Sequence, residues 1–273
     1  MMWVQMYSGK TLALHSYKGG TGKTTLIANL AAIFASEGKR VCLLDFDLYA
    51  PSLATYFRKD PTSCLYDVLN GEMNITEILV DLSSELGLKG KLLLGFSSPR
   101  KEDIQEIEIK HDLKWQLKAM RRFLAAKKTM FNRYDLDYVL LDTGPGIRYW
   151  SINTLAAADL LFLTMKISDM DIEGTKKMTA DIYDTLTKFG SKYYIILNKV
   201  PGAAPIEDPD WDANAFTLEE ELENYIGTKV VGSVPCFCEI QFNRHEFLFA
   251  VNQPEHLFSK KMKLLAEKID KLP

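Results

Sequence analysis

The stretch "SYKGGTGKTTLIANLAA", Ser16 to Ala32, decides the fold class of this chain. It follows a short apolar run and continues into residues with helical spacing. Gly19, Gly20 and Gly22 allow the backbone to turn tightly and to point several N–H groups at one position. The helix that begins after the loop adds the positive end of its dipole at the same place. A glycine-rich loop between a strand and a helix predicts a phosphate-binding site.

Short apolar runs alternate with helical patterns over most of the 273 residues. This alternation predicts an α/β fold with a single doubly wound, mainly parallel β-sheet of about seven or eight strands flanked by helices, as in a P-loop NTPase. The expected strands are 11–16, 40–47, 91–96, 137–142, 160–165, 193–198 and 229–234. The expected helices are 23–37, 111–132, 171–189, 216–226 and 257–271, and the irregular parts are 49–66, 97–110 and 200–212. We expect one domain over residues 1–273.

The composition is that of an ordinary globular protein. Lys and Arg number 33 and Asp and Glu number 36, so the net charge is −3, which argues against a protein that coats nucleic acid by charge alone. No apolar run approaches the roughly 18–20 residues that cross a bilayer, and the start lacks the apolar core of a signal peptide. Four cysteines are too few for a disulfide scaffold. We expect a cytoplasmic protein.

Three residues of the loop have types that suit a bound triphosphate. Lys23 is placed to reach the β- and γ-phosphates, Thr24 to put its hydroxyl on Mg²⁺, and Thr25 to touch the α-phosphate. The alternative is a strand–helix turn that is rich in glycine without binding phosphate. Lys18 comes too early in the loop to serve the same phosphates as Lys23, and it is either a solvent-exposed residue or has another task.

Acidic residues follow two of the expected strands. Asp45 and Asp47 lie two positions apart at the end of "LLDFD", so in an extended chain both point to the same side. Asp142 ends the apolar run "YVLLD". The carboxyl ends of parallel strands are where ligands bind in such sheets, although a single Asp at a strand end can also be a helix cap.

The loop "KGGTGKTT", which begins with lysine, resembles the deviant Walker A motif of the MinD/ParA/Mrp family of ATPases, a branch of the SIMIBI class of P-loop NTPases. "IANLAAIFASEGKRVCLLDFDLYAPSL" resembles the first helix and second strand of that family, and "DYVLLDTGPGI" resembles its Walker B and switch II segments. "IILNKV" and "VVGSVPCFCEIQFNRHEF" are similar to its base-binding segments. The likeness covers most of the chain and is weakest between about 49 and 135.

The resemblance implies ATP and Mg²⁺ as cofactors and slow hydrolysis that a partner stimulates. It assigns the deviant Walker A loop to 18–25, switch I to 45–52 and switch II to 142–148. Lys18 would cross a dimer interface and touch the nucleotide of the other protomer. Thr24 would bind Mg²⁺ directly, and Asp45 and Asp142 would hold it through water. Asp47 would orient the attacking water, and the N–H of Gly146 would contact the γ-phosphate. The other nucleotide contacts would come from Gly19, Gly20, Thr21, Gly22, Lys23 and Thr25. The segment "DTGPGIRYWSIN" departs from the commoner family forms, which leaves the geometry of switch II open.

The resemblance also assigns the base. Asn198, followed by Lys199, would hydrogen-bond adenine, helped by the backbone near Pro235. An amide both donates and accepts, which suits the purine edge. Guanine-specific relatives carry an aspartate where this chain has Pro201, so ATP is favoured over GTP. The alternative is that Asn198 is a simple strand-end turn residue.

Two helical patterns bear on partners. In 257–271 an apolar stripe faces away from most of the lysines, and we expect it to pack on the sheet, with membrane contact at most peripheral. In 111–132 one side carries Leu113, Leu117, Met120, Leu124 and Phe131, and another carries Lys114, Lys118, Arg121, Arg122 and Lys128. The basic side is either a solvated face or a contact for DNA backbone, and DNA is not favoured because acidic residues lie nearby.

The function that these features favour is an ATP-dependent homodimer that positions or partitions a cargo and answers to an activator protein. A second hypothesis is an iron–sulfur carrier of the Mrp type. The Cys-x-x-Cys of that branch lies after the Asn-bearing strand, where this chain has no cysteine, and no role is assigned to Cys236 and Cys238. A DNA-associated partition ATPase is the third. A metabolic kinase or ligase would need a second substrate pocket that the sequence does not indicate.

Overall fold

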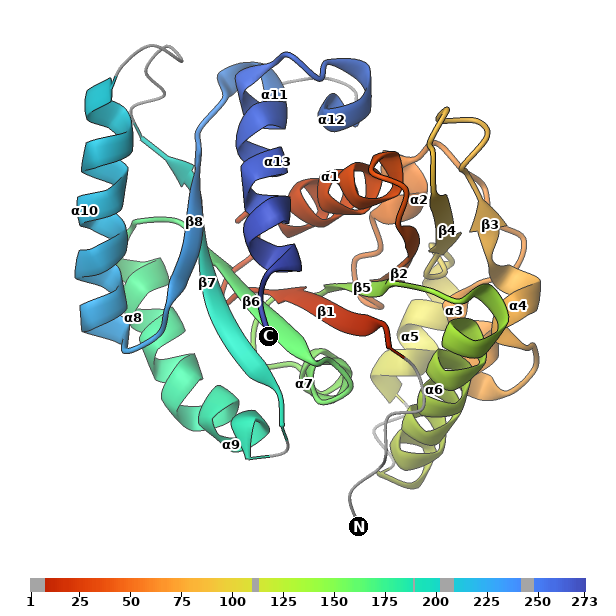
Figure 1. Ribbon diagram of the computed structural model, residues 1–273. Helices are drawn as coiled ribbons and strands as arrows, with labels where there is room; N and C mark the ends of the chain where they lie inside the picture. The colour runs from red at the N-terminus through yellow and green to blue at the C-terminus, as the bar shows by residue number, and fades with distance from the viewer. Residues whose placement is uncertain (1–7, 110–112, 189, 202–208, 242–247) are drawn as a thin grey trace.

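One β-sheet organises the chain, with the strand order β3-β4-β2-β5-β1-β6-β7-β8 (Figure 1). The computed structural model describes residues 8–109, 113–188, 190–201, 209–241 and 248–273. The strands are β1 (Lys10–His15), β2 (Arg40–Phe46), β3 (Val80–Asp81), β4 (Lys91–Gly95), β5 (Tyr138–Thr143), β6 (Leu160–Met165), β7 (Lys192–Val200) and β8 (Val230–Pro235). Only β3 runs antiparallel to its neighbour. The predicted doubly wound, mainly parallel sheet is confirmed.

The central strands are apolar on both faces because helices cover both. In β1, Leu12 and Leu14 point into one core and Ala13 into the other, and in β2 Leu43 and Leu44 divide in the same way. Side chains alternate across a strand, so a run without polar residues must be buried on both sides. The long apolar runs of the sequence therefore become the centre of a three-layer structure.

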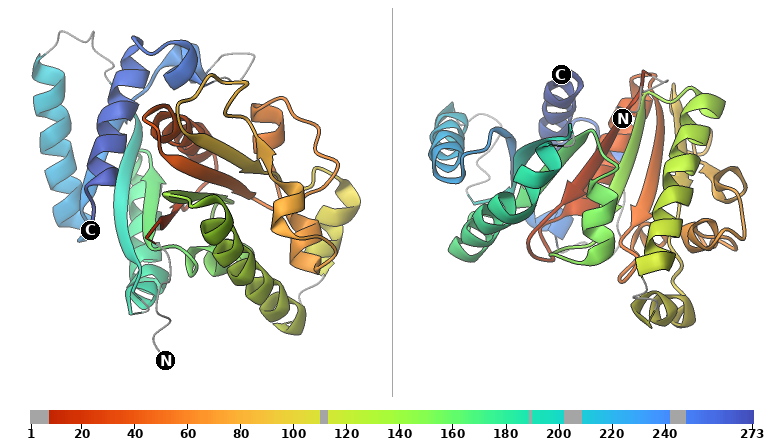
Figure 2. Two further views of the ribbon diagram at one scale, coloured as in Figure 1. Left: turned by 45° about the vertical axis from the view of Figure 1, so that its right-hand side comes forward. Right: turned by 90° about the horizontal axis from the view of Figure 1, so that it is seen from below.

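The helices form two layers, which Figure 2 shows on either side of the sheet. One layer holds α1 (Lys23–Ser36), α2 (Leu53–Tyr56), α11 (Cys238–Gln241), α12 (Phe249–Asn252) and α13 (Leu257–Asp270). The other holds α3 (Leu65–Asn70), α4 (Ile75–Ile78), α5 (Lys101–Ile109), α6 (Leu113–Tyr134), α7 (Tyr149–Leu155), α8 (Asp169–Met178), the π-helical turn Thr179–Tyr183, α9 (Asp184–Thr187) and α10 (Pro209–Ile226).

Several elements differ from the expectation. The two-residue strand β3 and the one-turn or two-turn helices α3, α4 and α7 are too short to give a periodic signal. The helix expected over 171–189 is two α-helices, α8 and α9, joined by a π-helical turn, and α10 begins at Pro209, seven residues before the expected start at 216. Part of the segment 200–212, expected to be irregular, lies outside the described residues.

The last helix packs as expected. Phe258, Met262, Leu265 and Ile269 of α13 are buried in the core shared with α1 and the sheet. The hydrophobic stripe of 257–271 is therefore an internal surface.

Helix α6 turns a different face to the core from the one that its leucines indicate. The buried residues are Gln116, Ala119, Phe123, Ala126, Lys127, Met130 and Phe131. Leu113, Leu117 and Leu124 are 59%, 50% and 46% exposed. Of the apolar side predicted from the sequence, only Phe131 is fully buried and Met120 is half-buried. The side of α6 that packs on the core is therefore formed by residues such as Phe123 and Met130 and not by the three leucines.

Candidate functional site

The glycine-rich loop joins β1 to α1 in a conformation that needs glycine. Gly20 and Gly22 have φ of 76° and 89°, the left-handed region. A Cβ at Gly22 would lie 2.4 Å from Nδ2 of Asn198. Asn198 donates from Nδ2 to the carbonyl of Thr21 at 2.7 Å, and Lys199 donates to the carbonyl of Gly20 at 3.0 Å. The end of β7, predicted to bind the base, is thus fastened to the phosphate loop.

Lys23 is held inside the loop. Its side chain is 7% exposed and its Nζ donates to Oγ of Ser16 at 2.9 Å. Burial lowers the pKa of Lys23, while the charges of Asp142 and Asp47 act in the opposite direction. Little water screens the charge of a buried ammonium, so it attracts an anion at the loop strongly once a cation neutralises the neighbouring carboxylates.

Thr24 and Asp142 lie side by side at the start of α1 and the end of β5. The hydroxyl of Thr24 donates to Oδ2 of Asp142 at 2.7 Å and lies 3.2 Å from Oγ of Ser52. Asp142 is 1% exposed, and its Oδ1 has no hydrogen-bond partner among the described residues. Burial raises the pKa of Asp142 to about 7, although Thr24 and Lys23 lower it. An orphaned buried carboxylate oxygen indicates a place for a cation or its water.

Asp45 differs from Asp142 in its hydrogen bonding, because backbone N–H groups occupy both of its carboxylate oxygens. It stands opposite Asp142 in the pairing of β2 with β5, and it is fully buried. Its Oδ1 accepts from the N–H of Asp47 at 3.1 Å, and its Oδ2 accepts from those of Ser52 and Leu53 at 3.1 and 3.0 Å. Burial and the charge of Asp142 raise its pKa. Asp45 therefore fixes the backbone of switch I, and its role in an Mg²⁺ shell stays a prediction.

Asp47 reaches from switch I to switch II. It is half-buried, and its Oδ1 accepts from the N–H of Ala50 at 3.1 Å. A Cβ added at Gly144 would lie 2.8 Å from the same oxygen, so only glycine admits this approach. Burial raises the pKa of Asp47, while hydrogen bonding to Ala50 and the charge of Lys23 lower it.

Gly146, predicted to sense the γ-phosphate, already has a partner. Its N–H donates to the carbonyl of Ser16 at 2.8 Å, with φ of 75°. This bond ties switch II to the strand that leads into the loop. The predicted contact would require the Ser16 bond to break, and it stays a prediction.

Lys18 points away from its own loop. Its Nζ lies 3.4 Å from Sδ of Met170 at the start of α8. Met170 is 67% exposed, and Ile147 of switch II is 57% exposed. The two lysines of one loop are therefore separated: Lys23 faces the acids inside, and Lys18 contacts the exposed Met170 outside.

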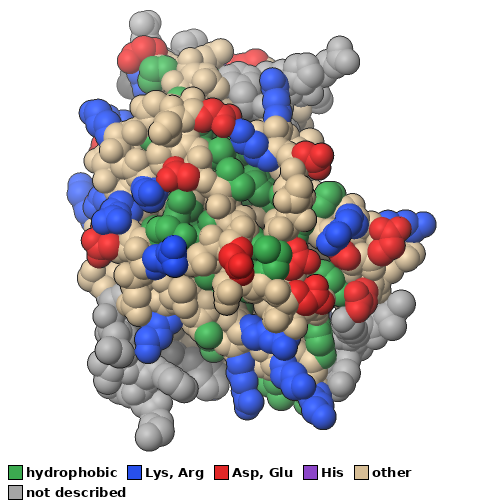
Figure 3. Space-filling model, turned by 90° about the vertical axis from the view of Figure 1, so that its right-hand side faces the viewer, with side chains coloured by type: hydrophobic (Ala, Val, Ile, Leu, Met, Phe, Trp, Pro, Cys, Tyr) green, Lys and Arg blue, Asp and Glu red, His purple; other side chains and the backbone are tan. Residues whose placement is uncertain are grey.

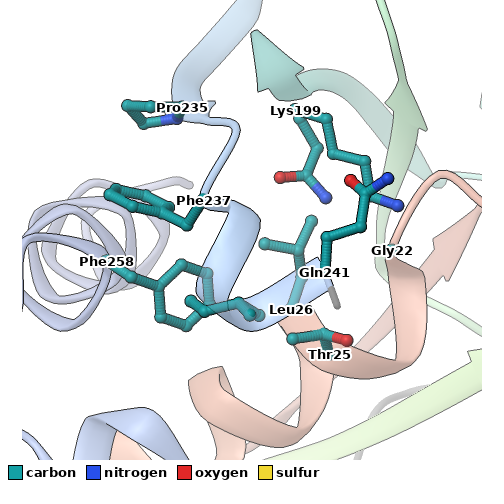
Figure 4. A pocket seen from close by; sticks show the side chains of 10 residues that line it. Gly22, Thr25, Leu26, Lys199, Pro235, Phe237, Gln241 and Phe258 are labelled. Atoms are coloured by element: carbon teal, nitrogen blue, oxygen red, sulfur yellow. The ribbon is translucent and has the colours of Figure 1, made fainter. Parts of the chain in front are cut away.

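A pocket opens beside the loop where the base is expected. Residues from four parts of the chain line it: Gly22, Thr25, Leu26, Asn198, Lys199, Pro235, Phe237, Ile240, Gln241 and Phe258 (Figure 4). The predicted Asn198, Lys199 and Pro235 are brought together here with Gly22 and Thr25. Phe237 and Gln241 fall within the segment expected to bind the base but were not singled out, and Phe258, in the last helix, was not expected there. Aromatic rings beside amides suit a planar, hydrogen-bonding base.

The donor set fits Mg²⁺ held with a triphosphate. Among the described residues no group of three His, Cys, Asp or Glu side chains is arranged to hold a metal alone. Mg²⁺ usually takes one or two protein ligands and completes its shell with water and phosphate oxygens. The Thr24 hydroxyl and the orphaned Oδ1 of Asp142 are such donors, beside the predicted phosphate position.

Two further residues connect the switches to the core. His15, at the end of β1, is fully buried, and its Nδ1 lies 2.9 Å from the hydroxyl of Thr143, which donates to the carbonyl of Leu14. His15 therefore donates to Thr143. Arg148 lies over the ring of Tyr49 at 4.5 Å. These contacts were not predictable from local sequence patterns, since each joins segments far apart in the chain.

A parallel sheet, a left-handed glycine loop and a buried lysine beside strand-end carboxylates define a P-loop NTPase. A model of the AAA domain family (AAA_31) matches residues 9–194. The chain therefore belongs to this family, within the MinD/ParA group of deviant Walker A proteins.

Three comparisons are informative. The sporulation initiation inhibitor protein Soj of Bacillus subtilis is 28% identical over 174 residues, 62% of this chain and 63% of Soj. The alignment thus spans less than two thirds of that relative. The cell division ATPase MinD of Pyrococcus furiosus superposes with a TM-score of 0.74 at 22% identity, over 97% of this chain and 100% of that one. MinD of Pyrococcus horikoshii, complexed with Mg-ADP, gives 0.73 at 21% identity, over 96% of each chain.

The cysteines do not form a cluster. Cys236 is half-buried and Cys238 is exposed, both are free, and Sγ of Cys236 lies 3.6 Å from Oε1 of Gln241. The iron–sulfur hypothesis is not favoured.

None of the helices in the described ranges has the length and hydrophobicity needed to cross a membrane.

Proposed function

We propose that this protein is a Mg²⁺-dependent ATPase whose ATP-bound form pairs with a second copy of itself. One observation carries the proposal: Lys23 is buried against the acids of its own site, while Nζ of Lys18 lies outside on Met170. A second lysine in the same pocket would be redundant. On a shared surface it adds positive charge to the phosphates of the neighbouring site, as an arginine finger does.

Exposed apolar side chains on α8, where Lys18 contacts Met170, and on switch II support the shared surface. Ile147 and Met170 come from switch II and α8 and are more than half exposed. Apolar residues at the centre of an interface lose water on association, which favours pairing. Switch II carries Ile147, so a change at Asp142 or Gly146 would move part of this surface.

The residues of the site divide the chemical work. Lys23 and the loop N–H groups hold the phosphates, and Mg²⁺, when bound beside Thr24 and Asp142, neutralises phosphate charge. Asp47 accepts from the attacking water and orients it. Asn198 and the pocket at Pro235 hold adenine. All these residues belong to one domain over 1–273.

The pairing gives the protein a state that a cargo or an activator protein can recognise. ATP brings two copies together and hydrolysis releases them, so that the shared surface exists only with ATP. The paired, ATP-bound state therefore differs from the monomer at this shared surface, and a cargo or activator that binds there would recognise only the pair.

Light scattering with ATP, with ADP and without nucleotide tests the proposal. The Asp47→Ala variant, which blocks turnover, should double in mass with ATP, and Asp47→Ala with Lys18→Ala should stay monomeric while still binding ATP. Asp47→Ala with Lys89→Ala, a change at an exposed lysine between β3 and β4, is the matched control and should pair. A monomeric Asp47→Ala protein at saturating ATP contradicts the proposal.

A further inference from the structure

The exposed leucines of α6 are spaced as in a helix that packs against another helix. Leu113, Leu117, Met120 and Leu124 follow one another at intervals of four, three and four residues. This is the repeat of the a and d positions of a coiled coil. The core takes the neighbouring face, through Ala119 among others; it leaves the three leucines exposed and Met120 half-buried at its border. We call these four residues the α6 seam.

One edge of the α6 seam is basic at every heptad. Lys114, Arg121 and Lys128 recur every seven residues, at the flanking e position, and all three are exposed. The opposite flank is Gln116 and Phe123, which are buried in the core. The seam is thus a leucine ridge with the protein on one side and a row of positive charge on the other. Figure 3 views this side, and Lys and Arg side chains lie with hydrophobic ones along its lower edge.

We propose that the α6 seam docks an amphipathic helix of a partner protein, with apolar residues at the same spacing and acidic residues along one edge. The leucines supply apolar area, and the basic row selects acidic partners and fixes the register. The proposal does not depend on nucleotide turnover. It gives the surface used, which the proposed function leaves open.

The charge pattern argues against the other occupants. Two copies of α6 packed antiparallel would bring the e positions of both helices together, and like charges repel. DNA backbone would satisfy Arg121 and Lys128 but would leave the leucines without an apolar partner. A helix that lies on a membrane usually carries basic residues on both flanks of its apolar stripe, and here one flank is the protein core.

A different face of α6 contacts α7, the helix that follows switch II. Trp115, two residues from both Leu113 and Leu117 and so on the opposite side of α6 from them, packs edge-on against Trp150 of α7 with ring centroids 5.5 Å apart. Trp115 is fixed by a hydrogen bond from Nε1 to Oδ1 of Asn70 at 3.0 Å. α7 begins directly after switch II. The Trp115–Trp150 contact therefore fixes α6 from behind and leaves the seam free of α7.

A peptide titration tests the proposal. The probe is a fluorescein-labelled helix of about three heptads with Leu at a and d and Glu at e and g, titrated with the full chain and followed by anisotropy. We expect saturable binding that Leu117→Ala with Leu124→Ala weakens by at least about tenfold. Leu264→Ala, which removes a 52% exposed leucine on α13, is the matched control and should leave binding unchanged.

A charge exchange makes the test specific. Arg121→Glu with Lys128→Glu should weaken binding of the Glu peptide by about tenfold, and the same peptide with Lys in place of Glu should bind this variant more tightly than wild type. The changed residues are exposed, so circular dichroism should show an unaltered fold. The proposal is overturned if the Lys peptide does not bind Arg121→Glu with Lys128→Glu more tightly than it binds wild type. It is also overturned if the Glu peptide binds the leucine variant and the charge variant as tightly as it binds wild type.

Two other outcomes also overturn it. Wild type that sediments with phosphatidylserine vesicles through Leu117 and Leu124, without binding the peptide, makes the seam a membrane surface. A wild-type mass that falls in Leu117→Ala with Leu124→Ala makes it an interface between copies.

Discussion

The guanidinium of Arg148 lies 4.5 Å from the ring centroid of Tyr49, and this cation–π contact joins switch II to the segment that follows Asp47. Arg148 also acts on Asp47, lowering the pKa of that carboxyl against the effect of burial. Asp47 and Gly144 are in close contact as well. The two switches are thus in direct contact in the structure without nucleotide, and a movement of one should displace the other.

Arg148→Ala should slow ATP hydrolysis about two- to fivefold, because a cation–π contact at an exposed site is worth roughly 0.5–1 kcal/mol. Nucleotide affinity should change little, since Arg148 does not line the base pocket. Tyr49→Leu should have the same effect, and the double variant should be no slower than either single variant. Additive losses in steady-state phosphate release would show that the two residues act separately.

Neighbouring residues of α6 should respond in opposite ways. Phe123 is fully buried and packs edge-on against Phe46, with centroids 4.5 Å apart, whereas Leu124 is 46% exposed. Phe123→Ala should lower the free energy of unfolding by about 3–5 kcal/mol, and Leu124→Ala by less than about 0.5 kcal/mol. Urea titration measures both, and equal losses would mean that α6 is turned the other way.

The charge of Asp142 should destabilise the nucleotide-free fold. Its pKa is raised to about 7 by burial, so its contribution to stability is full below about pH 4 and is lost as the pH rises through 7. At pH 8 without Mg²⁺, Asp142→Asn should raise the melting temperature by roughly 2–8 °C, from about 1–2 kcal/mol.

The matched control for that change is Asp181→Asn, at an exposed carboxylate outside the site, which should leave the melting temperature unaltered. The stabilisation should shrink at pH 5. An Asp142→Asn protein that melts below wild type at pH 8 would show that the carboxylate is satisfied in the free protein.

His15 should act with the opposite sign. Burial, followed by the charge of Lys23, lowers its pKa to about 3. A lowered histidine pKa contributes stability above its unfolded value near 6.5, and this is lost as the pH falls toward 3, at up to about 1.4 kcal/mol per pH unit.

His15→Asn keeps a donor for Thr143 and does not titrate. The stability of wild type relative to this variant should therefore fall between pH 7 and pH 5, as measured by urea unfolding at each pH. A constant difference across that range would mean that His15 does not have a lowered pKa.

The strands, the loop and the carboxylates at strand ends were predictable because each produces a local signal. Apolar runs, the glycines and the lysine spacing need no distant partner to be recognised. The orientation of α6 was not predictable in this way. Two apolar faces compete on that helix, and only the shape of the sheet below it selects Phe123 over Leu124.

The binding roles show the same division. The meeting of Lys23, Thr24 and Asp142 at one place was predictable from their types and positions, and their binding roles stay predictions. The capture of Asp45 by the N–H groups of switch I was not, since a strand-end carboxylate is equally suited to metal and to backbone. The bond from Gly146 to Ser16 and the place of Phe258 beside Pro235 join segments far apart in the chain.

The amino-acid sequence by itself determined a parallel sheet with a phosphate loop at one edge, because periodicity and glycine spacing are properties of neighbouring residues. The tertiary structure alone decided where each of the two loop lysines points and which face of α6 meets water. Those outcomes depend on competition for a limited buried volume, and that competition is settled only when distant segments pack together.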